Sequence, residues 1–226
     1  MKHIGQLNTL LSSAFIIAAL LSSPVYAKNF FCNGTTGSED LETREIDLEA
    51  FNEIRVSDVF EVKISFGKER SVKLRIDDNL FDSIGLRIWD KRLAVKFDQR
   101  ICPSQRPKLD IVMPSLIAMD VSGAVDTRIN HFSGDSFEFE LSGAGSLRID
   151  GKVDSLKLQV SGAGDIKARN LVAKNADVDL SGAGSADIHV TEKLVAEVSG
   201  VGSVKYWGDP KHTSKEVSGI GSIHAR

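Results

Sequence analysis

Hydrophobic and polar residues alternate with a period of two along most of the chain. In the C-terminal half the alternation passes through six serines, and an apolar residue stands directly before each of them. Because successive side chains of a strand point to opposite faces, this pattern predicts strands that bury one face. The residues before the serines are Val121, Leu141, Val160, Leu180, Val198 and Val217. The alternation resumes after each serine, as in Leu147 and Ile149, so each repeat contains two strands.

Each of these serines begins a bend of small residues. The motif is Ser-Gly, a small or apolar residue, and a second glycine, with Val125 in place of that glycine in the first copy. The serines lie 20, 19, 20, 18 and 19 residues apart, which is a strong repeat signal. The bend glycines are Gly123, Gly143, Gly145, Gly162, Gly164, Gly182, Gly184, Gly200, Gly202, Gly219 and Gly221.

Two architectures fit a repeat of two strands. In an antiparallel meander, matching positions would be two strands apart, and nothing would require the bends to be alike. In a parallel β-solenoid, each repeat is one coil and matching residues stack about 4.8 Å apart. Six similar bends favour the solenoid, with coils of about 19 to 20 residues. Glycine in the bends would permit either a positive φ or a close approach of stacked backbones.

Upstream of the repeats the strand pattern continues without these bends. Residues 51–98 alternate as an irregular strand-rich half, residues 99–108 contain two prolines and predict a loop, and residues 109–226 form the regular half. No segment after residue 27 has helical periodicity. The predicted fold class is therefore all-β, a parallel β-helix over residues 51–226.

Residues 1–27 have the features of a cleaved signal peptide, which leaves residues 28–50 as an N-terminal extension. A weakly basic start precedes an apolar run that is too short to span a bilayer, and no later stretch is apolar enough to do so. We expect export to the periplasm or the cell surface. In an oxidising compartment, Cys32 and Cys102 are candidates for a disulfide worth on the order of 4 kcal/mol, and the alternative is two unpaired thiols.

Composition and motifs exclude several kinds of chemistry. The chain of 226 residues has 28 Lys and Arg against 31 Asp and Glu, a net charge of −3, so no nucleic-acid partner is expected. The histidines lack metal-ligand spacing, the glycine and aspartate spacing of calcium-binding β-rolls is missing, and the bends precede strands rather than a phosphate-binding helix. We expect no metal and no cofactor.

One pair of segments imitates a serine esterase. Gly134-Asp135-Ser136 and Asp209-Pro210-Lys211-His212 resemble the blocks in which a carboxylate orients the histidine that activates the serine. Those blocks belong to an α/β scaffold, whereas Ser136 falls in a turn between strands. Because a motif without its structural setting is weak, we predict no catalytic residue.

Charged residues form two outward rows. The residue two positions before each serine is acidic, except for Gln159. The residues six positions after the serines form the second row, which contains Arg128, Arg148, Lys167, Asp187, Lys205 and His224. Like charges at strand spacing repel, so one interpretation is that both rows are solvated faces screened by neighbours and salt. The alternative hypothesis is an elongated surface for cations, glycans or envelope polymers. It would consist either of the acidic row, with Asp120, Glu140, Asp179, Glu197 and Glu216, or of the basic row, with Arg148, Lys167 and Lys205, beside exposed Tyr206 and Trp207.

Several segments together resemble a bacterial family, the "putative auto-transporter adhesin, head GIN domain". They are Phe51-Asn52-Glu53-Ile54, Leu93-Ala94-Val95, Met113-Pro114-Ser115-Leu116, the repeated bends, and Tyr206-Trp207-Gly208-Asp209-Pro210. The resemblance covers about residues 45–226 and implies an exported, right-handed β-helix whose biochemical function is not established. Lys215 departs from the pattern, because it stands in an apolar row of the last coil.

Three functional classes remain open from the sequence. The first is a non-enzymatic adhesin or cell-envelope binding module, which export, the repeat surface and the resemblance favour. The second is a periplasmic carbohydrate-active enzyme, which would need loops inserted between coils, although the coil lengths differ by only two residues. The third is a purely structural envelope protein. A glycan or another envelope component is the partner that the first class implies.

Overall fold

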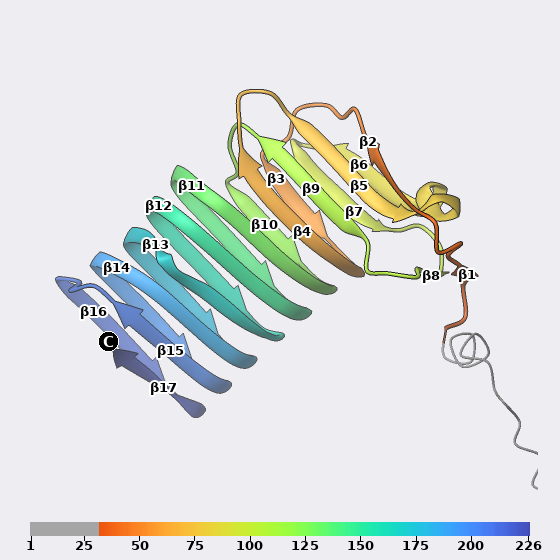
Figure 1. The fold of residues 1–226 in the computed structure, drawn as a ribbon. Coiled ribbons are helices and arrows are strands. Elements are labelled where there is room, and N and C mark those ends of the chain that lie inside the picture. The colour runs from red at the N-terminus through yellow and green to blue at the C-terminus, as the bar shows by residue number, and fades with distance from the viewer. Residues whose placement is uncertain (1–31) are drawn as a thin grey trace, which may run out of the picture. The chain divides into compact units, whose positions relative to one another are not determined.

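The computed structural model describes residues 32–226, of which Asn33–Arg226 form one compact unit. This unit is almost entirely β structure and winds into a β-solenoid of about five turns (Figure 1). The predicted fold class is thereby confirmed, while the right hand of the coil stays a prediction. The predicted signal peptide lies outside the described residues. In residues 32–226, no helical segment has the length and hydrophobicity of a membrane span.

The regular half is a stack of long strands that pair in parallel and in register. Its strands are β10 (Ala118–Val121), β11 (Ala124–Leu141), β12 (Ala144–Val160), β13 (Ala163–Leu180), β14 (Ala183–Val198), β15 (Val201–Trp207), β16 (His212–Val217) and β17 (Ile220–Ala225). Each Ser-Gly bend lies between two of these strands. We call the segment before a bend the pre-bend wall of the coil and the segment after it the post-bend wall.

Each long strand turns a second time near its middle and so contributes to both walls. The pairing of β11 with β12 shifts register between Ile129 and Phe132, and the later pairs shift at the corresponding places. His131 has a φ of 57° and Gly151 a φ of 129°, which lets the chain turn there. A coil therefore has one bend at the serine and one in the middle of the strand.

The Ser-Gly bends stack so closely that only glycine fits. A Cβ atom added to Gly182 would lie 1.9 Å from the carbonyl oxygen of Gly162, and one added to Gly162 would lie 1.8 Å from that of Gly143. Among the described glycines, only Gly151 and Gly208 have a positive φ. Close approach of backbones, rather than backbone conformation, is therefore the reason for glycine in the bends.

A further, degenerate coil lies in the irregular half. Strands β3 (Glu53–Val56) and β4 (Val59–Phe66) pair in parallel with β10 and β11, and Ser57 stands beside Ser122 with 2.9 Å between their hydroxyl oxygens. Asp58 occupies the position of the bend glycine at a φ of 63°. The stack of coils thus begins before the repeat becomes visible in the sequence.

The other elements of the irregular half introduce antiparallel pairing. Strand β2 pairs with β5, β5 with β9 and β6 with β7, all antiparallel, while the short β8 in the predicted loop pairs in parallel with β1. The elements are β1 (Thr35–Thr36), β2 (Leu41–Glu45), β5 (Ser71–Asp77), the 3₁₀ helix η1 (Asp78–Ser83), β6 (Ile84–Trp89), β7 (Arg92–Phe97), β8 (Ile101–Cys102) and β9 (Lys108–Met113).

The core consists of apolar rows from both walls. Its largest buried side chains include Phe60, Phe132, Phe137 and Phe139, which fill the first coils. Later coils place smaller apolar residues in the same rows, and these side chains are buried as well. Neither Cys32 nor Cys102 is a free cysteine, and their pairing with one another stays a prediction.

A buried carboxylate fastens the N-terminal segment to this core. Asp77, fully buried at the end of β5, accepts hydrogen bonds from the backbone N–H groups of Glu39 and Ser104, both at 2.9 Å. Burial alone would raise the pKa of Asp77, but the hydrogen bonds from Ser104 and Glu39 outweigh it and hold the pKa below its usual value. The ionised form therefore stabilises the fold.

Replacing a bend glycine tests the close stacking. We expect Gly182→Ala to lower the free energy of unfolding by at least about 2 kcal/mol, because the new methyl group collides with a neighbouring backbone that cannot move alone. The matched control is Ser181→Ala, which removes an exposed hydroxyl with no hydrogen bond in the described structure. Urea unfolding measures both. Equal stability of the two variants would contradict the close stacking.

Acidic pH should weaken the attachment of the N-terminal segment at Asp77. A carboxylate with a lowered pKa stabilises the folded state above its unfolded pKa, and this stabilisation is lost as the pH falls through the lowered value. We expect Asp77→Asn to cost about 1 to 3 kcal/mol at pH 7, because an amide N–H₂ then faces a backbone donor. The difference from wild type should shrink below about pH 4. Urea unfolding at several pH values checks this, with exposed Asp82→Asn as the control.

Candidate ligand-binding surface

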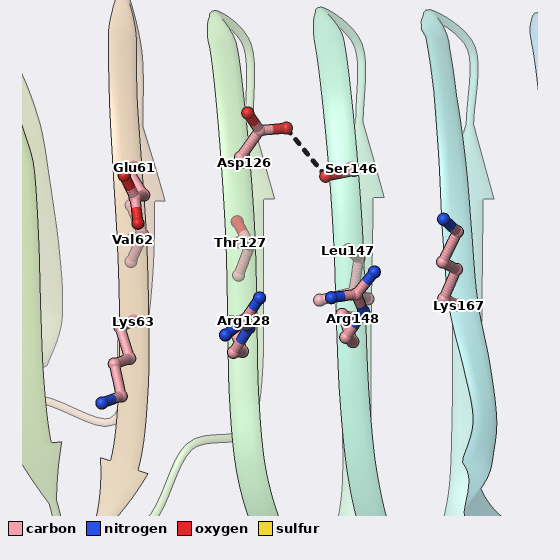
Figure 2. A pocket seen from close by; sticks show the side chains of 10 residues that line it. All are labelled: Glu61, Val62, Lys63, Asp126, Thr127, Arg128, Ser146, Leu147, Arg148 and Lys167. Carbon is pink, nitrogen blue, oxygen red and sulfur yellow. Dashed lines mark hydrogen bonds between the residues drawn. The ribbon is translucent and has the colours of Figure 1, made fainter. Parts of the chain in front are cut away.

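A shallow pocket of about 360 Å³ lies on the post-bend wall, across strands β4, β11, β12 and β13 (Figure 2). Its charged lining is mostly basic, with Lys63, Arg128, Arg148 and Lys167 against Glu61 and Asp126. The four basic residues alternate with buried residues of the same strands, as outward positions of a half-buried strand must. We call these four residues the four-cation row.

The strand register places the four-cation row in a single line. Arg128 pairs with Lys63 on one side and with Arg148 on the other, and Arg148 pairs with Lys167. Neighbouring members therefore stand one strand apart, about 4.8 Å at the backbone. Figure 2 shows them on four neighbouring strands. The sequence prediction placed Arg148 and Lys167 on this surface, and the structure brings them together.

None of these four cations has a hydrogen bond or an ion pair to any group in residues 32–226. The acidic side chains beside them interact with other partners. Glu61 forms an ion pair with Lys108 at 2.8 Å, and Asp126 pairs with Arg106 while accepting a hydrogen bond from Ser146 at 2.7 Å. The row is thus an uncompensated line of positive charge.

Acidic residues end the row on both sides. Lys63 pairs with Asp110 of β9, and Lys167 pairs with Asp187 of β14. Lys205 comes one strand beyond Asp187. Lys205, which the sequence analysis included in the same surface, is therefore separated from Arg148 and Lys167 by a negative charge. The continuous basic surface comprises four residues.

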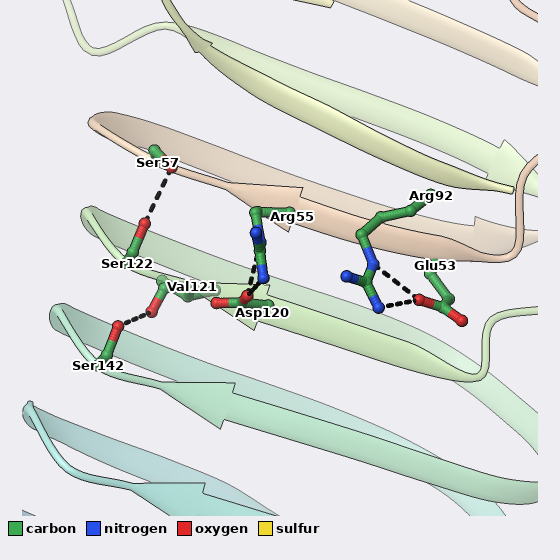
Figure 3. A network of polar contacts seen from close by, with 8 residues as sticks. All are labelled: Glu53, Arg55, Ser57, Arg92, Asp120, Val121, Ser122 and Ser142. Carbon is green, nitrogen blue, oxygen red and sulfur yellow. Dashed lines mark hydrogen bonds and ion pairs between the residues drawn. The ribbon is translucent and has the colours of Figure 1, made fainter. Parts of the chain in front are cut away.

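The acidic row follows the pre-bend wall and is compensated at its beginning. Asp120 forms an ion pair with Arg55 at 2.6 Å, one strand away from a second pair between Glu53 and Arg92 (Figure 3). The register then stacks Glu140, Gln159, Asp179, Glu197 and Glu216.

A lysine lies beside this row in its middle coils. Lys157 donates a hydrogen bond to Glu138 at 2.7 Å, which raises the pKa of its ammonium group, and Glu140 adds to this effect. Within residues 32–226, no group of three or more His, Cys, Asp or Glu side chains is placed to hold a metal ion. The acidic row therefore provides no metal centre in the described chain.

The two aromatic residues of the predicted surface do not form an exposed platform. Tyr206 is only 6% exposed, and its hydroxyl accepts a hydrogen bond from Lys215 at 3.1 Å. Trp207 is partly covered by the guanidinium group of Arg169, 4.5 Å from its ring centroid. The prediction of an exposed Tyr206 was wrong, because this residue continues the inward row of its strand.

The two segments that resemble a serine esterase do not come together in the structure. Ser136 and His212 belong to one row of paired residues, in which Ser155, Asn175 and Lys193 lie between them. Four strand spacings of about 4.8 Å separate the two backbones by roughly 19 Å, far beyond hydrogen-bonding distance. Asp135 and Ser136 are exposed and lie within β11, so the expectation that Ser136 falls in a turn between strands was wrong.

Sequence reasoning missed Lys63, which lies in the irregular half. A signal was present: Ser57 is followed by the alternating residues Phe60, Val62 and Ile64, as a bend serine is followed in the regular coils. The missing glycine hid this copy of the repeat. Arg128 was recognised in the outward row but not assigned to the binding surface.

Residues 50–210 match the model of a family described as "putative auto-transporter adhesin, head GIN domain". No curated protein matches the chain. The match covers both the irregular half and most of the regular coils, including every residue of the four-cation row.

Solved structures with the same fold come from Bacteroides and Parabacteroides species. A putative adhesin from Bacteroides fragilis is 25% identical with a TM-score of 0.74, and the alignment covers 85% of this chain and 100% of that one. A putative adhesin from Parabacteroides merdae is 19% identical with a TM-score of 0.53, covering 85% and 98% of the two chains. A third, from Parabacteroides distasonis, is 18% identical with a TM-score of 0.51, covering 85% and 99%.

Repulsion within the four-cation row should lower the free energy of unfolding. Arg148 stands between Arg128 and Lys167, and two like charges at this distance repel by up to about 1 kcal/mol in water. We expect Arg148→Gln to raise the free energy of unfolding at low salt, by an amount that shrinks in 1 M salt because of screening. Urea unfolding at both salt concentrations measures the change.

The matched control for this measurement is Lys205→Gln. Lys205 belongs to the same outward row, but its neighbours are Asp187 and His224, so removing its charge should bring no gain in stability. A loss of stability in Arg148→Gln at low salt would show that this arginine stabilises the fold through contacts, and would contradict the repulsion.

Proposed function

The chain belongs to the putative auto-transporter adhesin, head GIN domain family, and we propose that it is an exported, non-enzymatic binding module of the bacterial cell envelope. The observation that carries the proposal is the pocket on the post-bend wall with its four-cation row. Four cations on neighbouring strands that have no partner within residues 32–226 favour an anionic ligand, because such charges gain most from a partner that brings opposite charge.

The scaffold supports a binding role in a second way. The row projects from strands that pair along almost their whole length, so its side chains start from fixed, evenly spaced positions. Binding surfaces gain affinity from such preorganisation, because less conformational freedom is lost when the ligand binds. An extended wall suits a partner that is itself extended.

The non-enzymatic part of the proposal is supported by the chemistry of the pocket. Acid–base catalysis needs a group that can exchange a proton with the substrate, and the acids of the pocket, Glu61 and Asp126, are each engaged by another cation. The remaining charged groups are lysines and arginines, which suit charge recognition. A carbohydrate-active enzyme is therefore the less favoured interpretation.

The export part of the proposal is supported by residues 1–27, which have the pattern of a signal peptide. We expect intact mass measurement of protein from bacterial cells to show removal of these residues. Fractionation should then recover the domain outside the cytoplasm, and protease added to intact cells distinguishes a surface location from a periplasmic one. Cytoplasmic protein that retains residues 1–27 would overturn the proposed export.

Binding is tested separately with the purified domain. We expect it to sediment with isolated cell envelopes and to be released by 1 M salt, because salt screens charge recognition. Bovine serum albumin at the same concentration is the control for unspecific sedimentation. A domain that stays in the supernatant at low salt would contradict the proposed binding role and favour a structural one.

A further inference from the structure

We propose that the four-cation row binds a linear acidic polysaccharide that runs along the solenoid axis and places about one acidic group on each coil. This inference rests on the proposed function and specifies the ligand of the same pocket. It concerns Lys63, Arg128, Arg148 and Lys167 and the two acids that end the row.

The spacing of the row is the first argument. Three strand intervals of about 4.8 Å give a line of charge roughly 14 Å long, perpendicular to the strands. In an extended polysaccharide with one carboxylate or sulfate per sugar, the acidic groups recur once per monosaccharide, a repeat comparable to the strand spacing. A ligand of this kind can satisfy neighbouring cations in succession without folding back on itself.

The order of the side chains is the second argument. The two arginines are adjacent in the middle, and a lysine stands at each end. A guanidinium group can donate two parallel hydrogen bonds to a carboxylate or a sulfate, whereas an ammonium group acts as a point charge. The arginines therefore fix the orientation of two acidic groups, and the lysines extend the attraction to the neighbouring ones. The pocket volume lies within the range of ligand sites.

The local pairing of charges is the third argument. Arg106 and Lys108 lie next to the pocket and each has an acidic partner, so cations of this region find counter-charges where these are available. The acids Asp126 and Glu61 are used in that way, and the row between β4 and β13 remains without partners in the described chain. An arrangement that only served solubility would not need four like charges in one line.

The acids that end the row set the length of the ligand. Asp110 and Asp187 stand at the next positions on either side, where a fifth acidic group would meet negative charge. We therefore expect affinity to rise from a disaccharide to a tetrasaccharide and to gain little beyond it. A smooth increase with length is expected only for a surface without such ends.

The experiment measures binding of oligogalacturonates of two to six residues, and of a sulfated tetrasaccharide with one sulfate per sugar, by isothermal titration calorimetry at low salt. We expect the tetrasaccharides to bind, with the carboxylate and sulfate arms showing which acidic group is preferred. Arg128→Gln with Arg148→Gln should weaken binding at least about tenfold, as expected for lost charge-assisted hydrogen bonds. The charge-matched control, Lys205→Gln with Lys211→Gln, should bind within about twofold of wild type.

A gain-of-function variant tests the length rule. Asp187→Lys would join Lys167 to Lys205 and lengthen the row from four cations to six. We expect this variant to bind the hexasaccharide several-fold more tightly than the tetrasaccharide, whereas wild type binds both about equally. The comparison does not depend on a variant that removes a residue of the row, so a failure of one variant to fold leaves the proposal testable.

Three results of the binding measurements would overturn the inference. They are an equal loss of binding in the Lys205 and Lys211 control, no dependence on oligosaccharide length up to four residues, or tighter binding of single-stranded oligothymidylate or anionic phospholipid vesicles than of the acidic tetrasaccharides. If the arginine double variant sediments with envelopes as wild type does, the inference about this row fails, while the domain remains an envelope-binding module that uses another surface. Loss of sedimentation in that variant, with the control unaffected, supports both.

Discussion

Contact between backbones at the Ser-Gly bends is the constraint on which the rest of the structure depends. From the second bend onward the glycine lies directly against the carbonyl group of the glycine one coil earlier, and at the first bend Gly123 lies against that of Asp58, at distances that leave no room for a side chain. This contact brings the coils to strand spacing at one edge, and the parallel hydrogen bonds continue that spacing along both walls. The rows of apolar side chains in the core and the rows of charge outside are consequences of it.

The regular half could be predicted because this constraint restricts which residues can occupy the bends. Stacked backbones demand small residues at fixed intervals, and six copies of the bend made the β-solenoid recognisable. The coil of β3 and β4 was hidden because Asp58 adopts the turn by a positive φ instead of by the absence of a side chain. A different residue and backbone conformation at this one position were enough to obscure the repeat in the sequence.

The binding surface was less predictable, because its character depends on which charges are paired. The sequence shows Arg106, Lys108 and Arg148 as equivalent cations, and only the fold gives acidic partners to the first two. Arg106 lies in the loop before β9 and Lys108 in β9 itself. This strand pairs with β4, although many residues separate the two in the sequence. Tyr206 is a different case, because the alternation of its own strand places it in the inward row, where the structure buries it. Pairing of charges, by contrast, requires the three-dimensional neighbours.

The mid-strand bends give the two edges of the coil different roles. Register shifts occur on that side, between Ile129 and Phe132 and between Ala168 and Val172, whereas residues at the Ser-Gly edge pair without interruption. Differences in coil length are therefore absorbed at one edge only. For evolution and for protein engineering, this makes the mid-strand edge the natural place to insert loops that carry new specificity, while the glycine edge preserves the spacing between coils.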